Sequence, residues 1–319
     1  MVFWNSIESV ITILIIMALG YFISSKGIFE RDFGSSISWL VTRVALPASV
    51  FINVIKFFTR QKLINLSSDL IWPLIAIAIT YVIAFLCSKM LRTKQGRVGI
   101  FRTSFANANT LFIGLPINIA LFGMKSLPYL LVYYIVNTLS LWTFGAYMIA
   151  KDGMGKNVKT HKTSAKVIIS KLLPPPILGF IVAIIFIFIG LPVPSFANST
   201  LSYIGGLVTP LSLIFIGITL YKAGLKSIHF DKDTIGVILG RFVVSPLVLA
   251  LVVLPVPMPA VLRQTLIVQS ATPTPTVTPI LAKDAEADVE FATNTVTTTS
   301  VLFIIVVPIL MQLINLNYS

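Results

Sequence analysis

Apolar and polar positions alternate in long blocks along almost the whole chain. Seven blocks carry no charged residue and have about the 20 residues that an α-helix needs to cross a bilayer. They cover residues 9–25, 70–88, 127–150, 172–190, 203–221, 242–262 and 292–314. Three further blocks are weaker, because 33–55 contains Arg43 and because prolines interrupt 103–124 and 264–282. The pattern predicts an all-α polytopic membrane protein with ten membrane-spanning helices.

Lys and Arg residues collect on one side of these ten segments. The loops after the first, third, fifth, seventh and ninth segments hold sixteen of them, and the other loops hold five. Because basic residues stay on the cytoplasmic side during insertion, this count predicts that both termini lie outside. We therefore expect a multi-pass protein of the cell (plasma) membrane, in contact with the lipid bilayer.

The second half of the chain repeats the pattern of the first. The sequence around Pro47 resembles the sequence around Pro210, and the two prolines are 163 residues apart. The same offset relates Pro116 to Pro279 and carries the first five segments onto the last five. Agreement of all five positions with one offset predicts two structurally related halves.

The repeat also predicts the domain organisation. Residues 1–150 form the first five-helix repeat, 151–171 form a basic cytoplasmic loop, and 172–319 form the second repeat. Because five is an odd number, the second half must enter the membrane in the opposite orientation. Inverted repeats of this kind are typical of secondary transporters, whose substrates bind where two interrupted helices cross. Segments 103–124 and 264–282 are the matching interrupted pair.

Composition restricts the classes of function further. Hydrophobic residues make up 56% of the chain and charged residues 11%, with a mean hydropathy of +0.94, which excludes a soluble globular protein. The net charge of +13 comes from loops between apolar blocks, so it does not indicate nucleic-acid binding. One cysteine, Cys87, and two histidines provide no basis for a metal site. No HExxH, GxSxG or P-loop motif occurs, so we expect neither an enzyme nor a cofactor.

The fourth segment places two asparagines, Asn107 and Asn109, in the middle of the membrane. Such amides are costly there unless they find partners, and an asparagine can either cap a half-helix or donate to a carboxylate. Both are therefore candidates for substrate binding. The alternative is that they satisfy only the interrupted backbone.

The ninth segment is rich in proline and threonine. The part rich in these two residues contains Thr272, Pro273, Thr274, Pro275, Thr276 and Pro279. Three prolines so close together cannot lie in a regular helix, so the segment must unwind. The threonine hydroxyls can then bind a substrate or a cation, or they can donate to the freed carbonyls.

These two segments carry a family resemblance. Asn109 to Pro116, with Asn-Thr-Leu and then Gly114-x-Pro116, resembles the first crossover of the auxin efflux carrier family, which includes plant PIN-type carriers and bacterial malate or malonate permeases. Ala271-x-Pro273 resembles the second crossover, and the likeness extends over nearly the whole chain. Ala108 departs from the pattern, since PIN carriers have a crossover proline there.

The resemblance implies a carrier with a scaffold (segments 1, 2, 6 and 7) and a mobile core (segments 3–5 and 8–10), an elevator-like arrangement. It implies an organic carboxylate as substrate, with Asn109 as the residue that touches the carboxylate and Thr272 at the matching position of the other half. Gly114 and Pro116, with the three prolines of the ninth segment, form the crossover and hinge positions.

Three arginines lie within or at the ends of predicted membrane segments. Arg43, Arg102 and Arg241 can each bind a carboxylate bidentately, or each can extend its charge to the membrane surface. No acidic residue lies in the middle of the fourth or ninth segment, which argues against a carboxylate-based proton exchanger. The acidic residues of 284–290 are expected to form a solvated loop.

The sequence therefore predicts a secondary active transporter for small organic anions, with malate or a similar dicarboxylate favoured by the resemblance. The alternative is a sodium-coupled symporter or a cation/proton antiporter of related architecture. The coupling ion, H⁺ or Na⁺, stays open, as does the choice between a monomer and a homodimer.

Overall fold

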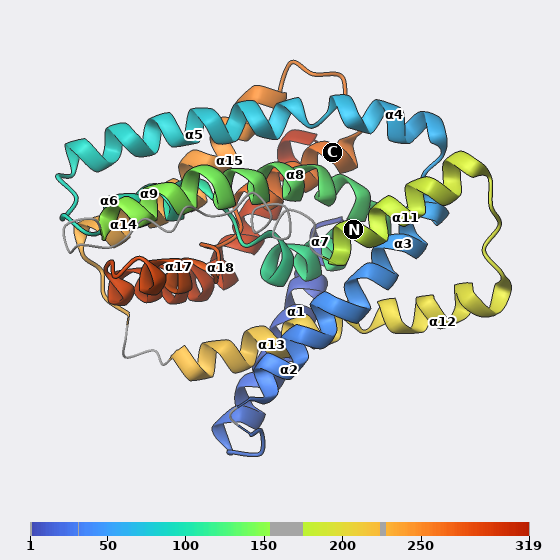
Figure 1. The fold of residues 1–319 in the computed structure, drawn as a ribbon, viewed down its shortest axis with the longest axis horizontal. Helices are drawn as coiled ribbons and strands as arrows, with labels where there is room; N and C mark the ends of the chain where they lie inside the picture. The colour runs from blue at the N-terminus through green and yellow to red at the C-terminus, as the bar shows by residue number, and fades with distance from the viewer. Residues whose placement is uncertain (1, 31, 154–174, 224–227, 319) are drawn as a thin grey trace.

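The computed structural model describes residues 2–30, 32–153, 175–223 and 228–318, and the regular elements of these ranges are all helices (Figure 1). The predicted basic loop at 151–171 lies outside the described residues from position 154 onward. The elements are α1 (Val2–Ser25), α2 (Phe33–Leu40), η1 (Val41–Ala45), α3 (Leu46–Phe57), α4 (Arg60–Ser68), α5 (Ile71–Met90), α6 (Val98–Ala106), η2 (Thr110–Gly114), α7 (Leu115–Phe122), η3 (Met124–Ser126), α8 (Leu127–Ser140), η4 (Leu141–Gly145), α9 (Ala146–Asp152), α11 (Pro175–Ile189), α12 (Ser195–Gly206), α13 (Val208–Ala223), α14 (Lys232–Leu239), η7 (Gly240–Val244), α15 (Ser245–Val253), α16 (Ala260–Ser270), α17 (Thr278–Asp284) and α18 (Val289–Tyr318).

Seven continuous helical segments of the described chain are long and apolar enough to cross a membrane, which confirms a multi-pass helical membrane protein. They are Phe33–Phe57, Leu66–Met90, Val98–Phe122, Met124–Asp152, Ser195–Lys222, Lys232–Val253 and Val289–Ile314. Two shorter apolar helices cover Leu14–Ser25 and Ile177–Ile189. The ten-helix inverted repeat stays a prediction.

The predicted bounds of the eighth segment are wrong. The eighth segment runs from Lys232 to Val253 and not from 242 to 262, so Arg241 lies inside it. Pro255, Pro257 and Pro259 end the helix early, because proline lacks a backbone N–H and clashes with the preceding turn. The charge of Arg241 is tolerated inside the helix because buried carbonyl groups surround it, as described below.

We name two sets of helices after the predicted scaffold and core: α1–α3 and α11–α13 are the scaffold group, and α5–α9 and α14–α18 are the core group. In the scaffold group, α1 lies against α13, and α3 lies against α11 and α12. In the core group, α6 lies against α5, α9 and α14, α8 lies against α16, and α17 lies against α18. Two glycines allow the closest approach within the scaffold group: a Cβ atom on Gly20 would lie 2.3 Å from the Ile214 carbonyl oxygen, and one on Gly217 would lie 2.0 Å from that of Met17.

The two groups meet through apolar side chains. Leu14 and Met17 of α1 and Ile216 of α13 lie on one side of a cavity of about 20 Å³, and Ile117 of α7 and Val307 of α18 lie on the other. Apart from Ser300, every residue that lines this cavity is apolar.

Within the described ranges, four helical segments contain a single π-helical turn: η1, η2, η4 and η7. Three of these turns end two residues before a proline, namely Pro47, Pro116 and Pro246. Because the proline ring clashes with the carbonyl group of the preceding turn, that turn widens to accommodate it. Such π-turns are frequent at functional sites.

Candidate functional site

Two broken helices meet in the core group. The first breaks between α6 and η2, and the second breaks between α16 and α17. The backbone N–H of Asn109 donates to the carbonyl oxygen of Pro273 at 2.8 Å, which joins the two breaks directly. We call residues 107–109 and 271–277 together the crossover.

Arg241 lies at the crossover and is fully buried. Its Nε and Nη2 atoms donate to the carbonyl oxygen of Thr272 at 3.0 and 2.9 Å, Nη2 also donates to that of Ser270, and Nη1 donates to that of Phe105 at 3.2 Å. These carbonyl groups lie at the C-terminal ends of α6 and α16, where helix dipoles are negative and carbonyl oxygens lack helical partners. The guanidinium thus caps α6 and α16, and of the two alternatives for Arg241 the extension to the membrane surface is wrong.

The first break is held by a cluster of polar side chains. Asn137 of α8 binds both backbone groups of Ala108: its Nδ2 donates to the carbonyl oxygen and its Oδ1 accepts from the N–H, each at 2.9 Å. Asn107 donates to Ser140 Oγ at 2.7 Å and accepts a hydrogen bond from the Tyr81 hydroxyl. The amide of Asn107 is therefore engaged with the protein at both ends, and we assign it to the support of the break.

The second break is held by one contact from α18 and one from the end of α16. The Thr274 N–H donates to Thr299 Oγ1 at 3.1 Å, and the Thr272 hydroxyl donates to the Gln269 carbonyl oxygen at 2.9 Å. Pro273 and Pro275 lie buried in the non-helical part, whereas Thr276 is only partly buried. The remaining predicted hinge positions occupy helix ends: Pro279 lies in the first turn of α17 and Pro116 in that of α7.

Asn109 differs from Asn107 because one of its amide atoms is unused. Its Oδ1 accepts a hydrogen bond from the Phe112 N–H at 3.3 Å, so it caps the half-helix that begins with η2. Its Nδ2 is buried and has no hydrogen-bond partner among the described residues. A buried donor without a partner at the positive end of a helix is suited to an anionic acceptor.

A second unused amide lies beside the first break. Gln269 of α16 is fully buried, and neither of its side-chain polar atoms has a partner within the described ranges. It packs on Gly114, where a Cβ atom would lie only 2.4 Å from Gln269 Oε1, so Gly114 provides room for the amide. Asn118 lies four residues after Gly114, and Thr265 lies four residues before Gln269. Their side-chain polar atoms are buried and unpartnered too, in the part of the chain that the structure describes.

The other two arginines do not reach the crossover. Arg102 donates from Nε to Ser88 Oγ at 2.9 Å, and its guanidinium carbon lies 4.1 Å from the centre of the Phe85 ring on α5. Arg43 is exposed in the scaffold group and lies beside Pro47 and Gly179. Of the three candidate arginines, the structure brings only Arg241 to Asn109 and Thr272.

The sequence interpretation missed Asn137, Gln269 and Thr299. All three are polar residues inside apolar membrane segments, and such residues are expensive unless they have a role. That signal was present in the sequence, because Asn137 lies in the middle of the uncharged block 127–150.

We expect Asn137→Leu to destabilise the crossover strongly. The change keeps the side-chain volume but leaves the buried N–H and C=O of Ala108 without partners, at about 1–3 kcal/mol each. The thermal unfolding midpoint of the purified protein in detergent measures the effect. Asn53→Leu is the matched control, because Asn53 is also buried but donates to a carbonyl of its own helix, that of Ser49 at 2.7 Å. Equal midpoints for the two variants would contradict the role of Asn137 in holding the backbone of Ala108.

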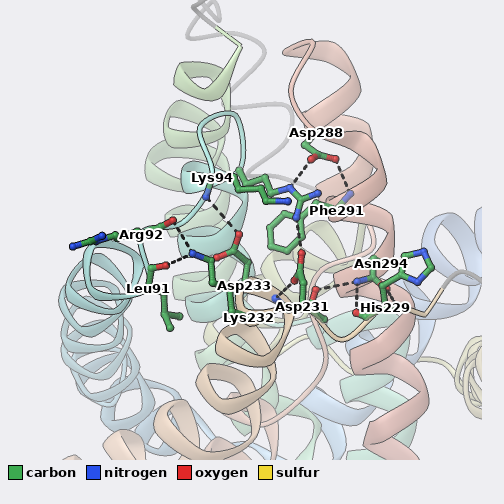
Figure 2. Close-up of polar contacts among 12 residues, drawn as sticks. Leu91, Arg92, Lys94, His229, Asp231, Lys232, Asp233, Asp288, Phe291 and Asn294 are labelled. Carbon is green, nitrogen blue, oxygen red and sulfur yellow. Dashed lines mark hydrogen bonds and ion pairs between the residues drawn. The ribbon is translucent and has the colours of Figure 1, made fainter.

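A charged cluster ties three core helices together at one end (Figure 2). Arg97, before α6, binds Asp231 at 2.7 Å and Asp288 at 2.5 Å, and it lies 4.8 Å from the Phe291 ring centre. Each carboxylate also caps a helix: Asp231 accepts from the Thr234 N–H, and Asp288 accepts from the Phe291 N–H. Asp288 is bound by Arg97 and only partly exposed, so the expectation of a solvated acidic loop is wrong for this residue. The sequence did not reveal the pair, because the two residues are 191 positions apart.

This cluster predicts a pH dependence. Burial acts to raise the pKa of Asp231, but hydrogen bonds from Thr234 and the charge of Arg97 outweigh it and lower the pKa below its ordinary value. A lowered folded-state pKa contributes stability above the unfolded pKa of about 3.9, and that stability is lost as the pH falls through the folded value. Below about pH 4 we expect the unfolding midpoint to fall more steeply for the unmodified protein than for Asp231→Asn. The exposed Asp284→Asn is the control, and identical profiles for all three proteins would contradict the prediction.

Broken membrane helices that meet at buried polar groups are typical of membrane transporters, and the chain is a membrane transporter. Residues 5–311 match the family described as membrane transport protein, so the chain belongs to that family. The match confirms the resemblance to the auxin efflux carriers.

Its relatives are similar along most of their length. An uncharacterized transporter of Methanothermobacter thermautotrophicus is 24% identical over 97% of this chain and 98% of its own. The uncharacterized transporter MJ1031 of Methanocaldococcus jannaschii is 22% identical over 94% and 96%. The uncharacterized transporter YfdV of Escherichia coli K12 is 20% identical over 77% of each chain.

Proposed function

We propose that the protein is a secondary active carrier for small organic anions, with malate or a similar dicarboxylate as the substrate. The observation that carries the proposal is the buried, unpartnered Nδ2 of Asn109 at the start of a half-helix. An N–H donor in that position binds a carboxylate oxygen more strongly than a neutral acceptor. Gln269 lies beside Gly114, at the end of the same π-turn, and its amide can bind a second polar group of the substrate.

The charge of Arg241 supports an anion over a cation. Four half-helix ends meet near the crossover, and the two C-terminal ends are negative. Arg241 neutralises both of these ends through the carbonyl groups of Phe105, Ser270 and Thr272. The described residues place no carboxylate in an ion pair with Arg241. The site is thus positive overall, with the N-terminal ends of η2 and α17 left for an anionic ligand.

The division into two helix groups supports an alternating-access mechanism. The crossover lies wholly in the core group. The scaffold group meets the core group through apolar side chains such as Met17 and Ile216. In this proposal the core moves against the scaffold and carries the bound anion from one side of the membrane to the other. The proposal includes the ten-helix inverted repeat and both termini outside the plasma membrane, which the distribution of Lys and Arg supports.

Sodium coupling is the second candidate mechanism. The unpartnered side-chain oxygens of Gln269 and Thr265 on α16 are neutral ligands of the kind that bind Na⁺ inside carriers, and Gln269 packs on Gly114 at the first break. Proton coupling has less support. A proton exchanger needs a titratable group beside the crossover, and no acidic residue lies in the middle of the fourth or ninth segment.

The proposal is tested by the uptake of radiolabelled L-malate into proteoliposomes that contain the purified protein. Gradients of pH, Na⁺ and voltage are imposed one at a time. We expect saturable uptake that other dicarboxylates compete with, and the effective gradient identifies the coupling ion. Uptake no greater than in empty liposomes under every gradient, for malate and for competing mono- and dicarboxylates alike, would overturn the anion proposal.

A further inference from the structure

A lateral groove lies between α5 and the α8–η4–α9 segment, which run side by side (Figure 1). It has a volume of about 550 Å³, within the range of about 300–1,000 Å³ that is usual for ligand sites. Its walls are apolar, with Leu74, Val82 and Phe85 on α5 and Leu139, Phe144 and Met148 on the other side. Val82 is 61% exposed and Phe144 51%, so the groove opens towards the lipid and away from the helix bundle.

The π-turn η4 shapes one wall of this groove. Ser140, Thr143 and Phe144 line it at or beside this turn. The Thr103 hydroxyl donates to the Gly145 carbonyl oxygen at 3.2 Å and thereby holds the turn against α6. The groove is thus a built feature of the backbone, since it arises at a widened turn with its own hydrogen bond.

Arg102 provides the charge at the groove. Its Nε atom is used by Ser88, and the plane of the guanidinium lies over Phe85. In the part of the chain that the structure describes, neither terminal nitrogen of Arg102 has a hydrogen-bond acceptor. The Lys89 ammonium lies 4.6 Å from the centre of the same Phe85 ring. Two cations therefore share one aromatic ring where the apolar groove ends.

We propose that this groove binds a phospholipid with an anionic headgroup. An acyl chain lies along the apolar walls, and the phosphate accepts bidentate hydrogen bonds from the two terminal nitrogens of Arg102, with Lys89 as a second cation. Basic pockets between membrane helices on the cytoplasmic side commonly bind anionic headgroups, and the predicted topology places Lys89 on that side. A small dicarboxylate does not suit the groove, because the walls provide almost no polar partner for it.

A lipid in the groove would also contact residues that hold the crossover in place. Tyr81 and Ser140 line the groove, and both bind Asn107 at the first break. An acyl chain packed on these two residues would restrict the motion of Asn107. We therefore expect an anionic lipid to raise the thermal stability of the protein as well as to bind.

The test is native mass spectrometry of the purified protein with phosphatidylglycerol or phosphatidylcholine of the same acyl chains, together with the unfolding midpoint under the same conditions. We expect phosphatidylglycerol to bind and to raise the midpoint more than phosphatidylcholine does. Arg102→Gln should weaken phosphatidylglycerol binding about tenfold, because it removes a bidentate charged contact. Arg43→Gln is the matched control, since Arg43 is also an arginine of a membrane segment but does not line this groove, and it should leave binding unchanged.

A second variant tests the apolar part of the site. Thr143→Trp places a large ring in the groove and leaves Arg102 in place, so it should abolish the preference for phosphatidylglycerol. Equal binding of the two lipids by the unmodified protein would overturn the proposal. So would full phosphatidylglycerol binding by Arg102→Gln, or equal stabilisation by soluble glycerol phosphate, which has the phosphate but no acyl chain. If Arg102→Gln does not fold, Thr143→Trp alone decides the outcome.

Discussion

Arg241→Gln should lower the unfolding midpoint of the purified protein by at least about 5 °C, through a loss of about 3 kcal/mol. The guanidinium satisfies three buried carbonyl oxygens at the ends of α6 and α16, and a glutamine amide can reach only one or two of them. Each buried acceptor left without a partner costs about 1–3 kcal/mol. We also expect transport to be lost, because the two negative helix ends would then face the anion site uncompensated.

Two further arginine variants show why Arg241→Gln loses stability. Arg241→Lys keeps the positive charge but loses the planar fork that binds three carbonyl groups at once, so it should recover only part of the stability. Arg43→Gln removes an exposed membrane arginine and should shift the midpoint by less than about 1 °C. Thermal unfolding in detergent measures all three variants. An unchanged midpoint for Arg241→Gln would show that the guanidinium does not hold the crossover together.

The three arginines show what the sequence could and could not predict. Residue type and position gave Arg43, Arg102 and Arg241 the same two interpretations, substrate contact or extension to the membrane surface. The fold separates them, because Arg241 lies inside the bundle and donates to carbonyl groups at two helix ends, whereas Arg102 packs against Phe85 on α5 and Arg43 is exposed. Which side of a helix a residue occupies depends on packing partners, and a single sequence does not contain that information for an almost uniformly apolar helix.

The breaks themselves were predictable. Pro273 and Pro275 exclude a regular helix whatever their neighbours are, and Asn109 is a typical N-cap residue. The structure has both features, with a non-helical stretch after Ser270 and a side-chain cap at Asn109. The contacts that fix the breaks were not predictable, since Asn137 and Thr299 approach them from other helices. Long-range pairing of this kind also explains why Arg97 and Asp288 were not recognised as partners.

Asn109→Asp should lower malate uptake about 100-fold while the protein stays folded. The aspartate keeps an oxygen to accept from the Phe112 N–H, so the cap on the half-helix survives. It replaces the unpartnered amide nitrogen by an oxygen, which removes the proposed donor and adds a charge that repels a carboxylate. Asn109→Ser is the matched variant, because it keeps a capping oxygen and replaces the amide N–H donors by a single, shorter hydroxyl without adding a charge.

The order of the uptake rates of the unmodified protein, Asn109→Ser and Asn109→Asp identifies the charge of the ligand. For an anionic substrate, uptake should fall from the unmodified protein to Asn109→Ser and again to Asn109→Asp, with unfolding midpoints within a few degrees of one another. If a cation occupied the crossover instead, the added carboxylate would attract it, and Asn109→Asp would transport at least as well as Asn109→Ser. Initial rates in proteoliposomes, measured with the same imposed gradient for all three, separate these outcomes. The second order would contradict the anion site even if Asn109 does contact the substrate, because the sign of the effect depends only on the charge that the amide meets.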